Sequence, residues 1–391
     1  MYLKQKRLNI LFVTPWYPTA NHKYAGIFVR EYAKAVKLHH NVVVLHLEAV
    51  DSVDSKRRFA NLVREDSQDL TEGIPTYRLY YSGIVFNHGA SIILPIAMLK
   101  GIRYLTNIFG RIDMIHAHVF TCGFFAAIVA KICGIPIVIS EHWTGFPLRK
   151  LSRWEVIEAW VAFSLADQVL PVSLPLQKAI ENYGLRTKFH VVPNVVNTLL
   201  FKPQVLNNNR NAPSRLLFIG SLIDRKGLSF LFEAMARLRS YGRDLVLDVV
   251  GMGPELKNYQ SLAEGLGLSE KIVFHGSKSK DEVATFFHQT DVFVLPSLCE
   301  TFSVVTAEAL SSGVPALVTR CGGPEDFVNE KSGMIVRPGD AQALADALCS
   351  MIDRLECYNR QEISHSAQAH FGYEAVANSL NSVYLKVLKY Q

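Results

Sequence analysis

The feature that most constrains this chain is a repeated alternation of short apolar runs with amphipathic helical segments. The apolar runs are rich in β-branched residues and are apolar throughout, as expected for strands buried on both faces of a sheet. Helices between such strands indicate parallel sheets covered on both sides. The first series of expected strands spans residues 8–14, 41–46, 113–116, 136–140, 168–171 and 189–193, and the second spans 215–219, 245–250, 271–275, 292–295, 316–319 and 334–336.

The two series are separated by a polar stretch, 194–213, which contains three consecutive asparagines and two prolines. A chain of 391 residues also exceeds the usual size of one core. The sequence therefore predicts an α/β protein of two Rossmann-like, doubly wound domains, 1–195 and 196–372, facing each other across a cleft. Ligands of such folds bind at the carboxyl ends of the strands. A final helix, about 373–391, can pack on either domain.

Composition narrows the class of protein. Apolar residues make up 49% and charged residues 19%, which excludes a disordered chain and a disulfide scaffold. The net charge is +6, and it is uneven: residues 1–195 carry 22 basic and 14 acidic side chains, whereas 196–391 carry 19 and 21. The basic half either meets an anionic partner or has a harmless surface bias. No nucleic-acid signature accompanies it.

The apolar segments and the cysteine spacing of the sequence favour a cytoplasmic location. The apolar run Ile10–Val13 is too short for a signal peptide, and the longest apolar stretch, Val119–Ile139, is interrupted by Lys131, Gly134 and Pro136. The six cysteines include no CxxC pair, which indicates reduced thiols and no disulfide framework. We expect a soluble protein.

The glycine pattern argues against one class of ligand and favours another. Neither half has a GxGxxG after its first strand, so a nicotinamide or flavin site is poorly supported. Instead, 220–227 combines Gly220, the adjacent cations Arg225 and Lys226, and the start of a helix, which suits a diphosphate. The alternative is an ordinary turn with exposed cations.

The most informative segment is 295–310, where a buried strand is followed by a loop and a helix. Glu300 lies in the loop and Glu308 on the second turn of the helix, within an apolar run. The amides of Phe302, Ser303 and Val304 are expected to be free to donate to a ligand. Helix capping and a solvated face would explain two glutamates equally simply, but a buried Glu308 needs a partner, which favours function.

Glu300, seven intervening residues and Glu308 resemble the E-x7-E signature of retaining family-4 glycosyltransferases with the two-domain GT-B fold. The resemblance extends over most of the chain. Four further segments are similar to the family's "D.IH.H", "PNGVD…F.P", "GxGP" and "V.F.G" motifs: Asp113–His118, Pro193–Pro203, Gly251–Pro254 and Ile272–Gly276.

The resemblance implies a role for each donor-site residue. Glu308 would bind the ribose, and Lys226 would neutralise the diphosphate. Glu300 would hold the donor sugar, together with the amides from Phe302 onward. The remaining donor-binding residues are Gly26, Ser221, Arg225, Gly276, Ser303 and Val304.

His118 and Gly26 would complete the site from the first domain. The resemblance places His118 beside the anomeric carbon and implies that Gly26 lets the diphosphate approach. His116, two positions earlier on the same strand, shares a face with His118 but lies deeper, so we expect it to have a structural role. It also has the last helix pack back on the first domain. Ser221 departs from the pattern because it replaces an arginine; Arg225 supplies a charge nearby.

These features predict a transferase that moves a hexosyl or N-acetylhexosaminyl group from a nucleotide-diphosphate sugar, UDP favoured and GDP-mannose second. No Asp-x-Asp occurs, so we expect no metal and no cofactor. The resemblance implies retention by same-face attack. The alternatives are a 2-epimerase-like enzyme and a non-catalytic nucleotide-sugar-binding subunit.

The acceptor side is predicted from His142, Trp143 and Arg149, where aromatic and basic residues follow a strand. Together with the charge of the first half, they indicate a glycan or lipid-linked acceptor in cell-surface polysaccharide or glycoconjugate synthesis. An anionic membrane surface would then be a further partner, with peripheral attachment at the inner face. The alternative is a half-buried tryptophan beside solvated cations.

Overall fold

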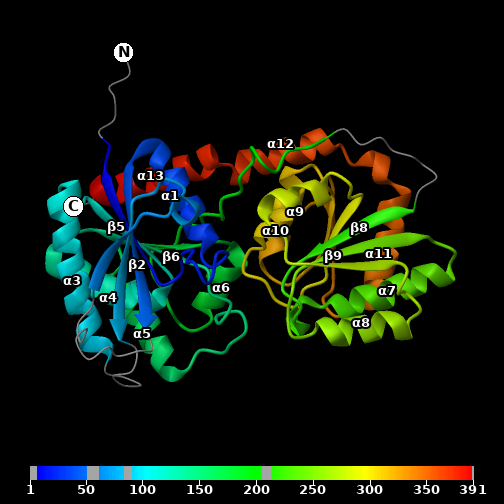
Figure 1. The fold of residues 1–391 in the computed structure, drawn as a ribbon, viewed down its shortest axis with the longest axis horizontal. Coiled ribbons are helices and arrows are strands. Elements are labelled where there is room, and N and C mark those ends of the chain that lie inside the picture. The colour runs from blue at the N-terminus through cyan, green and yellow to red at the C-terminus, as the bar shows by residue number, and fades with distance from the viewer. Residues whose placement is uncertain (1–6, 51–60, 83–89, 205–212, 390–391) are drawn as a thin grey trace, which may run out of the picture. The chain divides into compact units, whose positions relative to one another are not determined.

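The computed structural model describes residues 7–50, 61–82, 90–204 and 213–389 and divides the chain into two compact units (Figure 1). The N-terminal unit is Met1–Val195 with Tyr373–Gln391, and the C-terminal unit is Val196–Gly372. Each unit is a Rossmann-like α/β domain with a mainly parallel sheet, which confirms the predicted fold class. The cleft expected between them stays a prediction.

The N-terminal sheet has seven strands in the order β3-β4-β2-β1-β5-β6-β7, and all neighbours are parallel except β3 and β4. The order reverses at β1, so the helices before and after the reversal cover opposite faces of the sheet. The strands are β1 Asn9–Thr14, β2 Asn41–Val50, β3 Asn61–Glu65, β4 Thr76–Ser82, β5 Met114–His118, β6 Ile137–Glu141 and β7 Gln168–Pro171. The helices are α1 Ile27–His39, α2 Gln68–Thr71, α3 Ala90–Phe109, α4 Phe120–Cys133, α5 Arg153–Leu165, α6 Leu174–Glu181 and α13 Tyr373–Lys389.

Two parts of this sheet differ from the sequence expectation. Residues 189–193 form only an isolated bridge to β7, through Phe189. The amides of His190 and Val192 donate to the carbonyls of Val169 and Pro171, but Pro171 of β7 has no N–H with which to return a bond. The strands β3 and β4 were not expected, because β4 carries a charged residue in its centre. That residue, Arg78, is buried and donates to a Glu65 carboxylate oxygen at 2.7 Å, so the sheet itself neutralises it.

The C-terminal sheet has six parallel strands in the order β10-β9-β8-β11-β12-β13. Its strands are β8 Ser214–Ile219, β9 Leu245–Val250, β10 Ile272–Gly276, β11 Val292–Leu295, β12 Ala316–Thr319 and β13 Gly333–Val336. Its helices are η1 Asp224–Lys226, α7 Leu228–Ser240, α8 Leu256–Gly265, α9 Lys280–Phe287, α10 Val304–Ser311, η2 Gly323–Asp326, α11 Ala341–Asp353, η3 Leu355–Cys357 and α12 Arg360–Phe371. The order reverses between β8 and β11, which is where doubly wound sheets bind ligands.

The last helix, α13, packs against α1 in the N-terminal unit. Its buried side chains Val376, Leu380 and Val383 join the core formed by α1 and one face of the sheet. Its Tyr384 hydroxyl lies 2.6 Å from the Nδ1 of His116 on β5. In the described part of the chain, no helix is both long and apolar enough to cross a membrane.

Candidate functional site

Three glycine turns lie side by side at the carboxyl edge of the C-terminal sheet. The amide of Gly251 donates to the carbonyl of Gly276 at 2.9 Å, and the amide of Gly220 donates to that of Val250 at 3.0 Å. A Cβ on Gly251, whose φ is 139°, would lie 1.9 Å from the Gly220 carbonyl oxygen. The ends of β8, β9 and β10 therefore pack backbone against backbone, as only glycine permits. Gly276, one of the predicted donor residues, belongs to this edge.

The two adjacent cations are held against the loop that follows β11. The Arg225 guanidinium donates to the carbonyl of Cys299 at 2.7 Å, and the amide of Leu298 donates to the carbonyl of Arg225 at 2.8 Å. Lys226 forms an ion pair with Glu300, with 2.6 Å between Nζ and Oε1. Gly227 permits this arrangement, because a side chain there would meet the Pro296 carbonyl. The structure thus brings Arg225, Lys226 and Glu300 together, and leaves Ser221 on the exposed part of the same turn.

Glu300 is held in place with one oxygen uncommitted. Its carboxylate is buried, and Oε1 accepts from both Lys226 and the Ser297 hydroxyl, the latter at 2.8 Å. Among the described residues, Oε2 has no hydrogen-bond partner. The backbone of Glu300 is fixed by a bond from its amide to the Cys321 carbonyl at 2.9 Å. A positioned acceptor oxygen of this kind suits a sugar hydroxyl.

The start of α10 presents free amides, as expected. Ser303 adopts a left-handed φ of 71° and accepts a hydrogen bond from the amide of Thr306, so its side chain caps the helix. The amides of Phe302, Ser303 and Val304 find no acceptor in the described part of the chain. The Phe302 side chain itself is buried against Phe327, with ring centroids 5.1 Å apart. Phe302 can therefore contact a ligand through its backbone amide and not its ring, at the positive end of the α10 helix dipole.

Glu308 is buried on α10 and forms an ion pair with Lys280, the first residue of α9. The Lys280 ammonium also lies 5.7 Å from the centre of the Phe201 ring. Sequence reasoning missed Lys280, because a lysine at a helix start usually marks only the surface. No signal in the sequence pairs it with a glutamate 28 residues further on.

In the N-terminal unit, three histidines from two adjacent strand ends form a stack. His116 and His118 on β5 have ring centroids 4.5 Å apart, and His118 and His142 have centroids 5.5 Å apart. The Nδ1 of His118 lies 3.3 Å from the Nε2 of His142. Burial lowers the pKa of His116 and of His142 to about 3, and that of His118 well below its usual value. The stack is therefore uncharged at neutral pH.

His116 and His118 differ in their outer nitrogens. His116 is bonded on both sides, to Tyr384 and to the Ser140 hydroxyl at 2.8 Å, which fits a structural role. The Nε2 of His118 is buried and has no hydrogen-bond partner among the described residues. That unmet nitrogen is the kind of group that a bound ligand satisfies.

Val119 and the buried carboxylate of Glu141 lie next to the histidine stack and fix the backbone around it. Val119, directly after His118, has a φ of 72°, which is a rare value for a β-branched side chain. The Glu141 carboxylate accepts from the amides of Phe120, His142 and Trp143 at 2.8, 2.9 and 2.9 Å, and so ties β6 to the start of α4. Burial raises its pKa to about 7, against the lowering effect of these three bonds. Sequence reasoning missed Glu141, although its place before His142 is a possible signal.

The remaining predicted site residues of the N-terminal unit are Trp143, Arg149 and Gly26, and they differ in exposure. Trp143 is half-buried and stacks on Phe120, with centroids 5.2 Å apart, whereas Arg149 is exposed at a φ of 53°. Gly26 precedes α1 at a φ of 62°, and a Cβ there would lie 2.2 Å from the Trp16 carbonyl oxygen. The chain's own packing thus explains this glycine, and its predicted approach to a diphosphate stays a prediction.

Two Rossmann-like units in one chain are the architecture of the GT-B fold, and a glycosyltransferase family model matches each of them. The chain belongs to the glycosyltransferases of this class. Residues 25–199 match the model of Glycosyltransferase Family 4, and residues 203–366 match that of Glycosyl transferases group 1.

Relatives that match in sequence are glycosyltransferases and a glycogen synthase. The D-inositol 3-phosphate glycosyltransferase of Corynebacterium diphtheriae is 25% identical over 92% of this chain and 85% of its own length. The glycogen synthase of Mycobacterium tuberculosis is 26% identical over 70% of this chain and 69% of its own.

Solved structures share the fold. Sucrose-phosphate synthase from Thermosynechococcus elongatus matches with a TM-score of 0.76 and 20% identity, covering 98% of this chain and 100% of that one. HepE of Anabaena, solved in complex with UDP, matches with a TM-score of 0.76 and 18% identity over 97% of this chain and 100% of that one.

Proposed function

We propose that this glycosyltransferase moves a hexosyl or N-acetylhexosaminyl group, with retention, from a nucleotide-diphosphate sugar to a glycan or lipid-linked acceptor. The observation that carries the donor part is the Glu300–Lys226 pair. It sets one free carboxylate oxygen and one ammonium beside a helix start whose amides have no acceptor among the described residues. A sugar diphosphate needs an acceptor for its hydroxyls and donors for its phosphates, and this arrangement offers both.

UDP is the favoured nucleotide, and GDP-mannose is the second choice. HepE, which shares the fold, was solved with UDP and with UDP-glucose. Glu308 would bind the ribose hydroxyls, with its carboxylate paired to Lys280.

In the proposed mechanism, the leaving diphosphate is stabilised by Lys226, Arg225 and the amides of α10, without a metal. The bond between the anomeric carbon and the phosphate oxygen breaks as the acceptor oxygen attacks from the same face. The acceptor proton passes to the departing phosphate oxygen, so charge and atoms balance. The uncharged His118 would donate to or accept from the sugar through Nε2.

The acceptor would meet His142, Trp143 and Arg149 in the N-terminal unit. A glycan of the cell surface fits an aromatic platform with a nearby cation. A lipopolysaccharide outer core galactosyltransferase shares the fold, with a TM-score of 0.72 and 18% identity. We therefore propose a cytoplasmic enzyme that takes part in cell-surface polysaccharide or glycoconjugate synthesis.

The test is nucleotide release from UDP- and GDP-sugars, with and without a panel of glycan and polyprenyl-diphosphate-linked acceptors. We expect release to depend on an acceptor, with the anomeric configuration of the product, read by NMR, equal to that of the donor. Conversion of the donor to an epimer would support the 2-epimerase alternative. Tight nucleotide-sugar binding without turnover on any acceptor would support a non-catalytic subunit, and inversion would exclude the proposed mechanism.

A further inference from the structure

The two strand ends that carry the histidine stack are joined by one buried carboxylate. The ladder between β5 and β6 ends where the amide of Val119 donates to the carbonyl of Ser140 at 2.7 Å. Beyond this bond, the positive φ of Val119 turns the chain into α4, so the ladder stops. The next link between the two segments is the side chain of Glu141, which is fully buried.

Glu141 uses both of its carboxylate oxygens as acceptors for backbone amides. Oε2 accepts from the amide of Phe120, the first residue of α4, at 2.8 Å. Oε1 accepts from the amides of His142 and Trp143, both at 2.9 Å. One carboxylate therefore ties the segment that follows His118 to the segment that begins with His142, and it does so at the positive end of the α4 helix dipole.

This link sets the spacing of two histidine rings. His118 lies two residues before Phe120, and His142 follows Glu141 directly, so both rings are attached to backbone that Glu141 holds. Their facing nitrogens, Nδ1 of His118 and Nε2 of His142, lie 3.3 Å apart. The outer nitrogen of His118, Nε2, is buried without a partner among the described residues. The direction in which that nitrogen points therefore depends on the bonds of Glu141.

We propose that Glu141 is a positioning residue for glycosyl transfer: its ionised carboxylate holds the His118 ring in the orientation in which Nε2 meets the sugar. In the proposed function, on which this inference rests, His118 contacts the donor sugar. The charged form is required, because an ionised carboxylate only accepts, whereas a protonated one would turn its O–H towards an amide N–H. A small displacement of a group at the reacting centre lowers the rate strongly.

The charge of Glu141 changes near neutral pH. Burial raises its pKa to about 7, against the lowering effect of its three amide bonds. The titratable groups around it do not ionise in that range: burial lowers the pKa values of the three stacked histidines and raises those of Cys122 on α4 and Tyr32 on α1. Strand β7, the other neighbour of β6, has no ionisable side chain. The three bonds are therefore complete above pH 7 and are lost as the pH falls through this value.

The first experiment records the ring nitrogen resonances of His118 and His142 in the full chain, without ligand, across neutral pH. His118→Gln and His142→Gln assign the signals. We expect both rings to stay uncharged, and their resonances to shift with a midpoint at about pH 7 as Glu141 takes up its proton. In Glu141→Gln this shift should be absent. Wild-type resonances that do not change with pH, or that change equally in Glu141→Gln, overturn the inference.

Steady-state rates then connect the position of His118 to turnover. In Glu141→Gln, an NH2 group that cannot accept replaces one oxygen, so at least one backbone bond is lost. We expect kcat to fall by about 10- to 100-fold, with KM for the nucleotide sugar unchanged within about twofold. The acid limb of kcat at about pH 7 should disappear in this variant and remain in Glu141→Asp, which keeps the charge. A lower kcat with the wild-type pH profile would make Glu141 a merely structural residue and contradict the inference.

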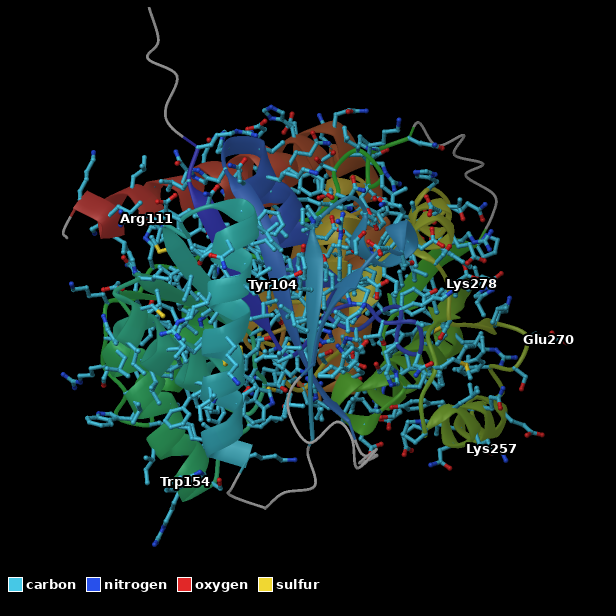
Figure 2. The ribbon with its side chains drawn as sticks, turned by 60° about the vertical axis from the view of Figure 1, so that its left-hand side comes forward. Tyr104, Arg111, Trp154, Lys257, Glu270 and Lys278 are labelled. Atoms are coloured by element: carbon cyan, nitrogen blue, oxygen red, sulfur yellow. The ribbon has the colours of Figure 1, made fainter. Side chains whose placement is uncertain are left out.

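Two controls keep the outcomes apart. Glu270, labelled in Figure 2, is an exposed glutamate between α8 and β10, so Glu270→Gln should keep the wild-type ring shifts and kcat. Thermal unfolding separates lost positioning from lost folding, and Glu141→Asp with the wild-type pH titration carries the test if Glu141→Gln unfolds. Ring shifts in a wild type that turns over no donor with any acceptor would contradict the proposed function, and would confirm the link between Glu141 and the histidines.

Discussion

At the scale of single residues, the candidate donor site keeps its buried carboxylates paired with lysines. Glu300 is paired with Lys226, and Glu308 with Lys280, in both cases with the carboxylate more deeply buried than the lysine. A buried carboxylate without a counter-charge would take up a proton and lose its acceptor strength. Each lysine thus supplies the counter-charge that the buried glutamate beside it needs.

Arg225 and Lys226 are expected to act on the same diphosphate, although they contact different atoms of the Glu300 loop. Lys226→Ala with Arg225→Ala should lower kcat/KM more than either single change. The coupling energy in the double-mutant cycle should be about 0.5–3 kcal/mol, the range for groups that share a partner. Strictly additive effects would exclude a shared role, and near-full activity of the double variant would move the diphosphate elsewhere.

The histidine stack predicts how the stability of the N-terminal unit depends on pH. Histidine has an ordinary pKa of 6.5, whereas burial lowers that of His142 to about 3 in the folded protein. Between these values only the unfolded chain binds the proton. The stabilisation is therefore complete above pH 6.5 and is lost as the pH falls, by up to about 1.4 kcal/mol per pH unit for each histidine. Glu141 acts oppositely, because its pKa is raised to about 7, and so offsets part of this loss.

Urea unfolding between pH 7 and 5, followed by tryptophan emission, measures this dependence. His142→Asn should lose less stability per pH unit than wild type, whereas the exposed His22→Asn should keep the wild-type slope. Equal slopes in all three proteins would show that His142 titrates normally in the folded state.

At the scale of the elements, continuous apolar runs made the buried strands predictable. The expected bounds of β7, β9, β11 and β12 agree with the structure, because each is a short, mostly apolar and buried run, although β7 begins with Gln168 and β9 contains Asp248. β4 was missed, since local periodicity cannot show that Glu65 neutralises Arg78 across an edge pair. The loop before α10 was predicted together with its free amides. Lys280 was not, because its pairing with Glu308 depends on how α9 and α10 pack.

The start of α10 gives a prediction about backbone strain. Ser303 holds a φ of 71° and caps the helix with its hydroxyl. Ser303→Ala removes the cap and keeps the unfavourable φ, so it should lower the free energy of unfolding of the C-terminal unit by about 1–2 kcal/mol. Ser303→Gly should lower the free energy of unfolding by only a few tenths of a kcal/mol, because glycine adopts the left-handed region freely.

Chemical denaturation followed by far-UV circular dichroism compares the two variants. A matched pair at Ser279, which caps α9 from an extended backbone, serves as the control: there glycine has no such advantage over alanine beyond its own capping tendency. Equal losses for Ser303→Ala and Ser303→Gly would show that the left-handed φ carries no strain.

At the scale of the whole molecule, the predicted roles are divided between the two units. The paired glutamates, the cations and the free helix start belong to the C-terminal unit, whereas the histidine stack, Trp143 and Arg149 belong to the N-terminal unit. The sequence indicated this division through its charge, since the excess of basic residues lies in residues 1–195.

The proposed stabilisation of the leaving group by side chains and amides predicts activity without a divalent metal. Turnover should survive dialysis against excess EDTA, because Lys226, Arg225 and the α10 amides supply the positive potential. The measurement is the initial rate of nucleotide release before and after chelation. Complete loss that magnesium or manganese restores would contradict the metal-free mechanism.

The most direct test of the donor site is a calorimetric titration of UDP, with GDP as the comparison, into wild type and Glu308→Gln. We expect one site in wild type, tighter for UDP. In the variant, binding should be about 10- to 150-fold weaker, which corresponds to about 1.5–3 kcal/mol for a lost charge-assisted hydrogen bond. The exposed Glu330→Gln should bind as wild type does. Equal affinity of UDP for wild type and Glu308→Gln would contradict the assignment of Glu308 to the ribose, and no nucleotide binding by the wild type would contradict the donor site itself.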